Sequence, residues 1–186
     1  MRLEQNMKLK SLTLSVLMAV TLVSQAFGQG MPPMTPPDEM KALAFMTGSW
    51  TGKMKMYGMG AEPVEADTDM VCEPILGGRF MRGMVTYDMG GMKMSGMQLQ
   101  TYDPELKKWK VWWFDSMSAV PVELTGDMNG KTCVLESKPM KMQGMEAESV
   151  FRATYVQVSD KEFTMKLEMK DGDKWSPVIE ETLKKK

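Results

Sequence analysis

From Ser49 onward, apolar and polar residues alternate in short segments separated by turn residues, and this pattern constrains the fold more than any other feature of the chain. Alternation with a period of two is typical of β-strands with one buried face. Turn signals such as Gly90-Gly91, Asn129-Gly130 and Asp171-Gly172 separate the segments. The pattern predicts ten strands, at 49–57, 62–74, 78–89, 92–103, 107–115, 119–127, 131–139, 145–158, 161–169 and 174–184.

Ten short strands joined by tight turns favour an all-β fold, an antiparallel up-and-down barrel. Closure of such a sheet removes the exposed edges that it would otherwise have. A β-sandwich is the alternative. One short helix is expected before the barrel, over residues 38–46, with Thr35 or Asp38 as its N-cap and Gly48 at its end. Its apolar stripe would consist of Met40, Leu43, Ala44 and Met46.

The N-terminal residues have the pattern of a targeting segment rather than of a folded element. Residues 1–28 combine a basic start, an apolar run over 12–23 and small residues at the end, which is typical of a secretory signal peptide. The Pro- and Met-rich residues 29–37 predict a flexible leader, and 38–186 form one barrel domain. We therefore expect an exported protein, periplasmic or secreted, with no membrane span in its mature part.

Composition excludes several kinds of chemistry. The chain contains no His, so it cannot form a Ser-His-Asp triad, a His-type zinc site or a proximal-His haem site. The net charge of −1 argues against a nucleic-acid partner. Cys72 and Cys133 are the two cysteines, and either a disulfide or two buried free thiols fits the sequence.

Methionine is the most over-represented residue, with 24 copies in 186 residues. Nine of them lie in three copies of the motif M-K-M-x-G-M, the Met tracts: Met54, Met56, Met59; Met92, Met94, Met97; and Met140, Met142, Met145. In an up-and-down barrel these tracts fall at odd-numbered connections, which share one end. Thioether sulfur is soft, so the tracts predict a Cu(I) or Ag(I) site, with the Gly of each motif letting the third Met fold back. An apolar rim around a ligand, or a simple compositional bias, is the alternative.

Four further residues are candidates for binding a ligand inside the barrel. Trp113 and Asp115 lie on the predicted inward face of strand 107–115, near the Met-rich end. Asp115 could orient a polar ligand group, or it could cap the turn at 116–118. Arg79 and Arg152 could clamp a ligand carboxylate, or they could form structural ion pairs or stack on an aromatic ring.

Several motifs resemble one family. They are G-S-W at 48–50, L-G-G-R-F at 76–80, Y-D at 102–103 and W-F-D-S-M-S at 113–118. In this order they resemble the uncharacterised bacterial exported family catalogued as domain of unknown function 1579, over about residues 38–184. The resemblance implies a lipocalin-like (calycin-like) barrel and no established activity. The C-terminal Lys184-Lys185-Lys186 differs from the Y-x-R ending associated with the family.

Three functional hypotheses follow. The first is an exported, non-enzymatic barrel that binds a small apolar or amphipathic molecule in its interior. The alternative is a Met-rich periplasmic protein that binds Cu(I) or Ag(I). The third is an enzyme that uses a carboxylate base, for which Asp115 is the candidate.

Overall fold

The structure is a computed structural model that describes residues 35–141 and 145–186. The predicted signal peptide, most of the predicted leader and Met142 lie outside these residues. No helix in the described part of the chain is long and apolar enough to cross a membrane.

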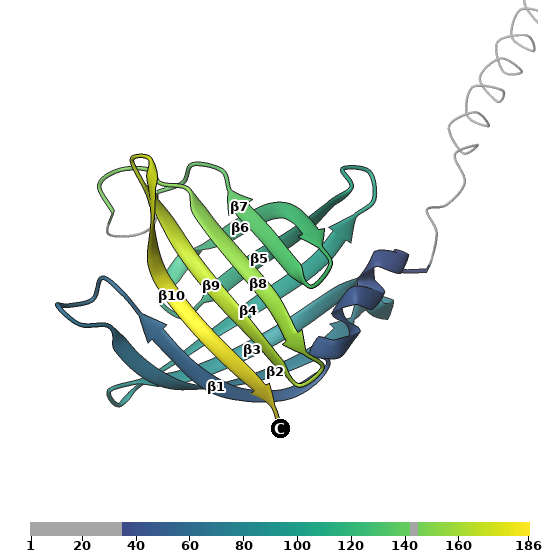
Figure 1. The fold of residues 1–186 in the computed structure, drawn as a ribbon, viewed down its shortest axis with the longest axis horizontal. Helices are drawn as coiled ribbons and strands as arrows, with labels where there is room; N and C mark the ends of the chain where they lie inside the picture. Colours follow the sequence, from purple (N-terminus) through teal and green to yellow (C-terminus); the bar gives the residue numbers. More distant parts are fainter. Residues whose placement is uncertain (1–34, 142–144) are drawn as a thin grey trace, which may run out of the picture. The chain divides into compact units, whose positions relative to one another are not determined.

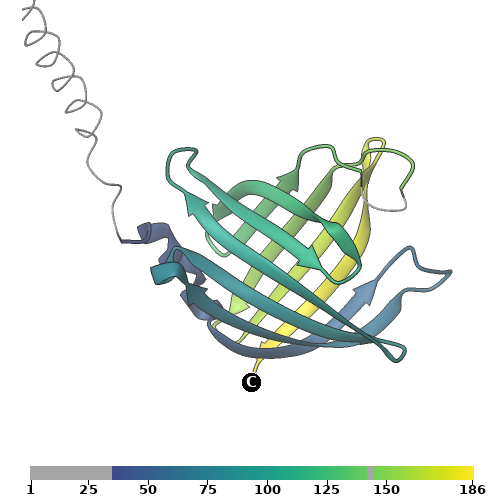
Figure 2. The same cartoon turned by 180° about the vertical axis from the view of Figure 1, so that it is seen from behind.

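Ten antiparallel strands form a closed barrel, which confirms the predicted fold class (Figures 1 and 2). Each strand pairs with the next along the chain, and β10 pairs with β1 to complete the ring. The strands are β1 (Gly48–Met56), β2 (Val64–Ile75), β3 (Phe80–Met89), β4 (Met92–Asp103), β5 (Lys108–Asp115), β6 (Ser118–Asn129), β7 (Thr132–Ser137), β8 (Phe151–Ser159), β9 (Glu162–Asp171) and β10 (Lys174–Lys185).

The sequence alternation accounts for this arrangement. In β2, Ala66, Thr68, Met70 and Cys72 are buried while the residues between them are exposed. Such a strand places every second side chain inside the barrel. The same alternation in β5 buries Trp109 and Val111, as predicted for the inward face of that strand.

The predicted N-terminal helix is present, but it is a 3-10 helix, η1 (Asp38–Met46), followed by the short η2 (Leu76–Gly78) later in the chain. In a 3-10 helix, side chains three residues apart share a face. Met40, Leu43 and Met46 are therefore buried, while Ala44 is exposed, which corrects the predicted stripe. The predicted caps are also wrong: Pro37 is the N-cap residue, and Gly48 already belongs to β1.

The connection between β7 and β8 is longer than the turn pattern predicts. β7 ends at Ser137 and β8 begins at Phe151 rather than at 145. Between them, Met140 and Ser149 form one isolated bridge, with each N–H donating to the other's carbonyl at 2.9 Å. The segment that precedes β8 alternates in sequence, but beyond this bridge its hydrogen bonds to a neighbouring strand are made at its end: Ser149 Oγ donates to the Lys170 carbonyl of β9 at 2.7 Å, and Lys170 N–H donates to the Val150 carbonyl at 2.9 Å.

The end of the barrel next to η1 is closed by aromatic packing around Trp50. The Trp50 side chain is 0 % exposed, and its Nε1 donates to the carbonyl of Met46 at 2.6 Å. The Phe163 ring packs edge-on against Trp50, at 4.9 Å between centroids. Lys185 makes a cation–π contact with Trp50 at this end, with Nζ 5.3 Å from the ring centroid. The same ammonium group donates to the carbonyl oxygen of Phe45 at 3.0 Å.

Candidate functional site

A cavity of about 310 Å³ occupies the interior of the barrel on the side away from η1. Its walls are mainly apolar, and inward-facing side chains such as Met70, Val85 and Leu167 form them. Met59 and Met117, each 57 % exposed, also line the cavity, so it reaches the surface beside the β1–β2 and β5–β6 connections. The barrel is therefore not filled solid by its own side chains.

Glu181 is the most deeply buried carboxylate of the cavity wall. It lies on β10, is 7 % exposed, and accepts a hydrogen bond at 2.7 Å from Thr68 Oγ1. Burial raises the pKa of Glu181 to about 6, and the Thr68 hydrogen bond offsets part of that effect. In the strand register, Met54 of β1 and Met165 of β9 flank it, and both line the cavity.

The side chains of Gln98 and Tyr155 meet inside the barrel. Tyr155 donates a hydrogen bond from its hydroxyl to Gln98 Oε1 at 3.2 Å. Gln98 is 3 % exposed, and its Nε2 is buried with no hydrogen-bond partner among the described residues. Burial raises the pKa of Tyr155, so the phenol remains a neutral donor. An unpaired buried N–H in a cavity wall is a binding group for a ligand oxygen.

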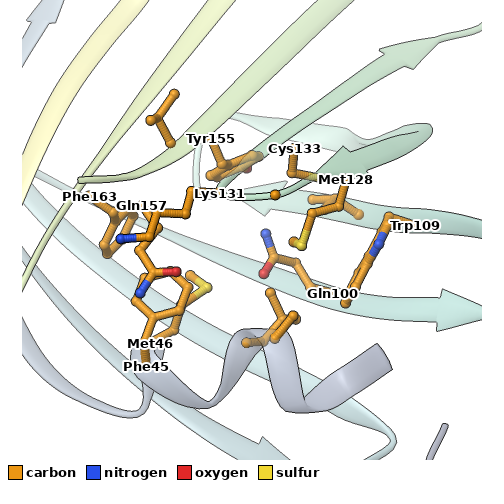
Figure 3. Close-up of a pocket in the computed structure, with 15 residues that line it drawn as sticks. Phe45, Met46, Gln100, Trp109, Met128, Lys131, Cys133, Tyr155, Gln157 and Phe163 are labelled. Atoms are coloured by element: carbon orange, nitrogen blue, oxygen red, sulfur yellow. The ribbon is translucent and has the colours of Figure 1, made fainter. Parts of the chain in front are cut away.

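A smaller cavity of about 120 Å³ lies between η1 and the barrel (Figure 3). Phe45 and Met46 of η1 line it together with Trp109 and Gln100, whose Oε1 is buried and unpartnered in the described part of the chain. Tyr155 lines both cavities, and so does Phe163. These two rings therefore stand between the two spaces.

Trp113 and Asp115, predicted from the sequence, both line the larger cavity. Trp113 Nε1 donates to Asp115 Oδ2 at 3.2 Å. The other oxygen of Asp115 accepts from the backbone N–H groups of Met117 and Ser118, at 2.7 and 2.8 Å. Asp115 therefore caps the turn and also lies in the cavity wall, so the turn-capping role and the position inside the barrel are compatible.

The two arginines occupy other places. Arg152 is paired with Glu168, at 3.1 Å from Nε and 2.8 Å from Nη2, and its guanidinium carbon lies 4.1 Å from the Trp175 ring centroid. Arg79 follows η2, and its carbonyl accepts a hydrogen bond from Thr101 at 2.7 Å. Neither side chain lines either cavity. Both arginines therefore lie outside the walls of the two cavities.

The connections at which the three Met tracts occur share one end of the barrel, but the second tract runs from this end into the middle of β4, where Met97 lies. The tracts lie at the β1–β2, β3–β4 and β7–β8 connections, which share an end in an up-and-down barrel. Their side chains differ in environment. Met54, Met56 and Met59 line the cavity; Met94 is buried and Met92 exposed; Met140 and Met145 pack against the core; Met97 is half-buried on the outer face.

The glycine of the second tract does not act as predicted. Gly58 of the first tract has φ +82° and turns the chain, whereas Gly96 lies inside the continuous strand β4. A Cβ at Gly96 would lie 2.2 Å from the Trp113 ring, so glycine is needed there for packing. Met97 therefore faces outward, in register between Met84 and Phe114, instead of folding back toward Met94.

The structure contains free thiols rather than a disulfide. Cys72 on β2 and Cys133 on β7 are both buried and unpaired with each other. Burial raises the pKa of each thiol to about 12, which suppresses the thiolate that metal binding or nucleophilic attack requires. Among the residues that the structure describes, no group of three or more Cys, Asp or Glu side chains is arranged to hold a metal ion.

Sequence reasoning missed Gln98, Tyr155 and Glu181 as site residues. A signal was present for the glutamate, because Glu181 alternates with Ile179 and Leu183 in an apolar series. That spacing places the carboxylate on the inward face of its strand. A charged residue in that position is unusual and marks a site worth testing.

Comparison with solved structures and with protein families gives the context. The crystal structure of Rv2717c from M. tuberculosis is similar, with a TM-score of 0.61 and 14 % sequence identity, over 81 % of this chain and 99 % of that one. At this identity the likeness shows the fold alone. Comparison with curated proteins gave no match. The sequence profile described as "Protein of unknown function (DUF1579)" matches residues 35–185, and the chain belongs to that family.

Proposed function

We propose that this protein is an exported, non-enzymatic barrel that binds a small apolar or amphipathic molecule in the cavity of about 310 Å³. The observation that carries the proposal is the cavity itself, an apolar space with a few polar groups in its wall. Pockets for small molecules typically have volumes of about 300–1,000 Å³ and this kind of lining. Gln98 and Glu181 would fix the polar part of the ligand. Export rests on the signal-like pattern of residues 1–28.

A neutral apolar fluorophore, N-phenyl-1-naphthylamine, tests the proposal. We expect its emission to rise and shift to the blue on titration, with one molecule bound per chain. Leu167→Trp should abolish this binding, because the larger ring would fill the cavity beside the small Ala153 that pairs with Leu167. Val134→Trp is the matched control, since Val134 is 39 % exposed on the outside of β7. Equal binding by both variants would refute an interior site.

A soft metal ion is the second candidate ligand. It is favoured by one observation: Met54, Met56 and Met59 of the first tract line the same cavity. Thioethers bind Cu(I) and Ag(I) in preference to Zn(II), and they need no deprotonation. We expect the triple Met→Leu variant of this tract to lose Cu(I) binding, measured by titration against a competing chelator. The triple Met→Leu variant of Met92, Met94 and Met97 is the comparison, and unchanged Cu(I) affinity in the first variant would exclude the first tract as the site.

A further inference from the structure

The larger cavity has an unbalanced charge. Two carboxylates, Glu181 and Asp115, are in its wall, and none of the described residues that line it is Lys or Arg. Asp115 has its oxygens engaged by Trp113 and by the turn. Glu181 accepts a hydrogen bond from the neutral Thr68 hydroxyl, and the described cavity wall places no cation beside the carboxylate. Glu181 is only 7 % exposed and has no counter-ion in this wall. Its ionised carboxylate would therefore interact strongly with any cation that enters the cavity.

The surroundings of Glu181 suit an organic cation with an apolar body. Trp113, Tyr87 and Phe151 line the same space, and aromatic faces attract cations. Met54 and Met165 flank the carboxylate in register with flexible, apolar side chains. A strongly hydrated inorganic cation would lose its water in such a wall, whereas a hydrophobic ammonium ion gains apolar contacts there.

Gln98 has a different preference from Glu181. Its unpartnered Nε2 is a hydrogen-bond donor, so it favours an oxygen atom on the ligand and not a cation. An amide is a neutral dipole, while Glu181 carries a full charge when it is ionised. Hydrogen bonds to charged groups are worth roughly twice those between neutral groups. The carboxylate therefore decides the sign of the charge that the cavity prefers, and Gln98 leaves room for a hydroxyl or ether oxygen beside the cation.

We propose that the interior cavity selects a hydrophobic cation, an alkyl- or arylammonium ion whose nitrogen pairs with Glu181 and whose apolar part lies against the Met and aromatic wall. This inference rests on the proposed function and narrows it. It excludes fatty-acid-like anions as the preferred ligands, since no arginine or lysine of the described lining could pair with a carboxylate.

The test uses three ligands with the same apolar chain: octylamine, octanol and octanoate, each titrated by calorimetry at pH 7.5. We expect octylamine to bind at least about tenfold more tightly than octanol, with octanoate the weakest. Glu181→Gln should reduce octylamine affinity by at least about tenfold and change octanol affinity by less than about threefold. Glu136→Gln, the same change at an exposed residue of β7, should leave all three affinities unchanged.

Octylamine affinity should also fall as the pH drops through about 6, because protonation neutralises Glu181. The titratable groups that face it from other strands are Cys72, Tyr87 and Tyr155; the pKa of each is raised, so all three stay neutral in this range. Asp115, which acts on Tyr87 together with Glu181, is the remaining carboxylate. Asp115→Asn should therefore keep the pH dependence, and Glu181→Gln should remove it.

The outcomes separate this inference from the function on which it rests. If octanol and octanoate bind as tightly as octylamine, or if Glu181→Gln leaves octylamine affinity unchanged, the charge preference is refuted and the interior binding site stands. If none of the three ligands binds and the fluorophore does not bind either, both proposals fail. Circular dichroism of Glu181→Gln establishes that the variant keeps the barrel.

Discussion

Trp50→Ala should lower the free energy of unfolding by about 3–5 kcal/mol, the range typical of removing a fully buried tryptophan. Trp50 is 0 % exposed, and three separate elements of the closed end meet on it. Its ring packs against Phe163 of β9, and Lys185 of β10 lies over its face. Its Nε1 donates a hydrogen bond to the carbonyl of Met46, the last residue of η1. The variant therefore loses apolar burial and leaves the Met46 carbonyl without its donor.

Chemical denaturation followed by circular dichroism measures this loss. Trp175→Ala is the matched control, because Trp175 is a half-buried residue of β10 that stacks on Arg152. We expect that control to cost about 1 kcal/mol, the scale of a partly exposed cation–π contact. If both variants lost the same stability, Trp50 would not be the centre of packing at this end.

Glu181→Gln should raise the free energy of unfolding at pH 7.5 by about 2 kcal/mol, an unusual gain for a buried substitution. The carboxyl has an ordinary pKa of 4.5, and burial raises it to about 6 in the folded state. Between these values the folded protein binds more protons than the unfolded chain. Stability therefore falls as the pH rises through this window, and above pH 6 the full penalty of a buried charge is present.

The gain should disappear at pH 4, because Glu181 is then protonated and resembles the glutamine. The difference between variant and wild-type unfolding, measured at several pH values, isolates this residue from the other carboxylates. Glu136→Gln should show no such pH-dependent gain, since Glu136 is exposed. A Glu181→Gln variant that is destabilised at pH 7.5, or stabilised equally at pH 4, would contradict the buried charge. A residue that reduces stability in this way is typical of binding sites.

The barrel itself was predictable from sequence because strand alternation and turn residues are local signals. The alternation of inward and outward side chains along β5 correctly placed Trp113 and Asp115 on the inward face, near the Met-rich end. The errors arose where tertiary contacts override local preference. η1 packs with a period of three, and the alternating segment after Gly144 lacks a partner strand over most of its length.

The candidate site was predictable only in part. Gln98 and Glu181 resemble surface residues when each is read alone, and only closure of the ring brings β4 and β10 to one cavity. Gly96 resembles a turn residue in the repeated motif, but its absent Cβ makes room for the Trp113 ring from the neighbouring strand. Such contacts depend on strand register, which a single sequence does not display.

A crystal structure of the protein grown with N-phenyl-1-naphthylamine tests the interior site most directly. We expect one molecule inside the barrel, with its apolar rings between Trp113 and Leu167 and with a polar contact at Gln98 or Glu181. A cavity occupied by rearranged protein side chains, with the fluorophore found only on the outer surface of the strands, would contradict the interior binding site.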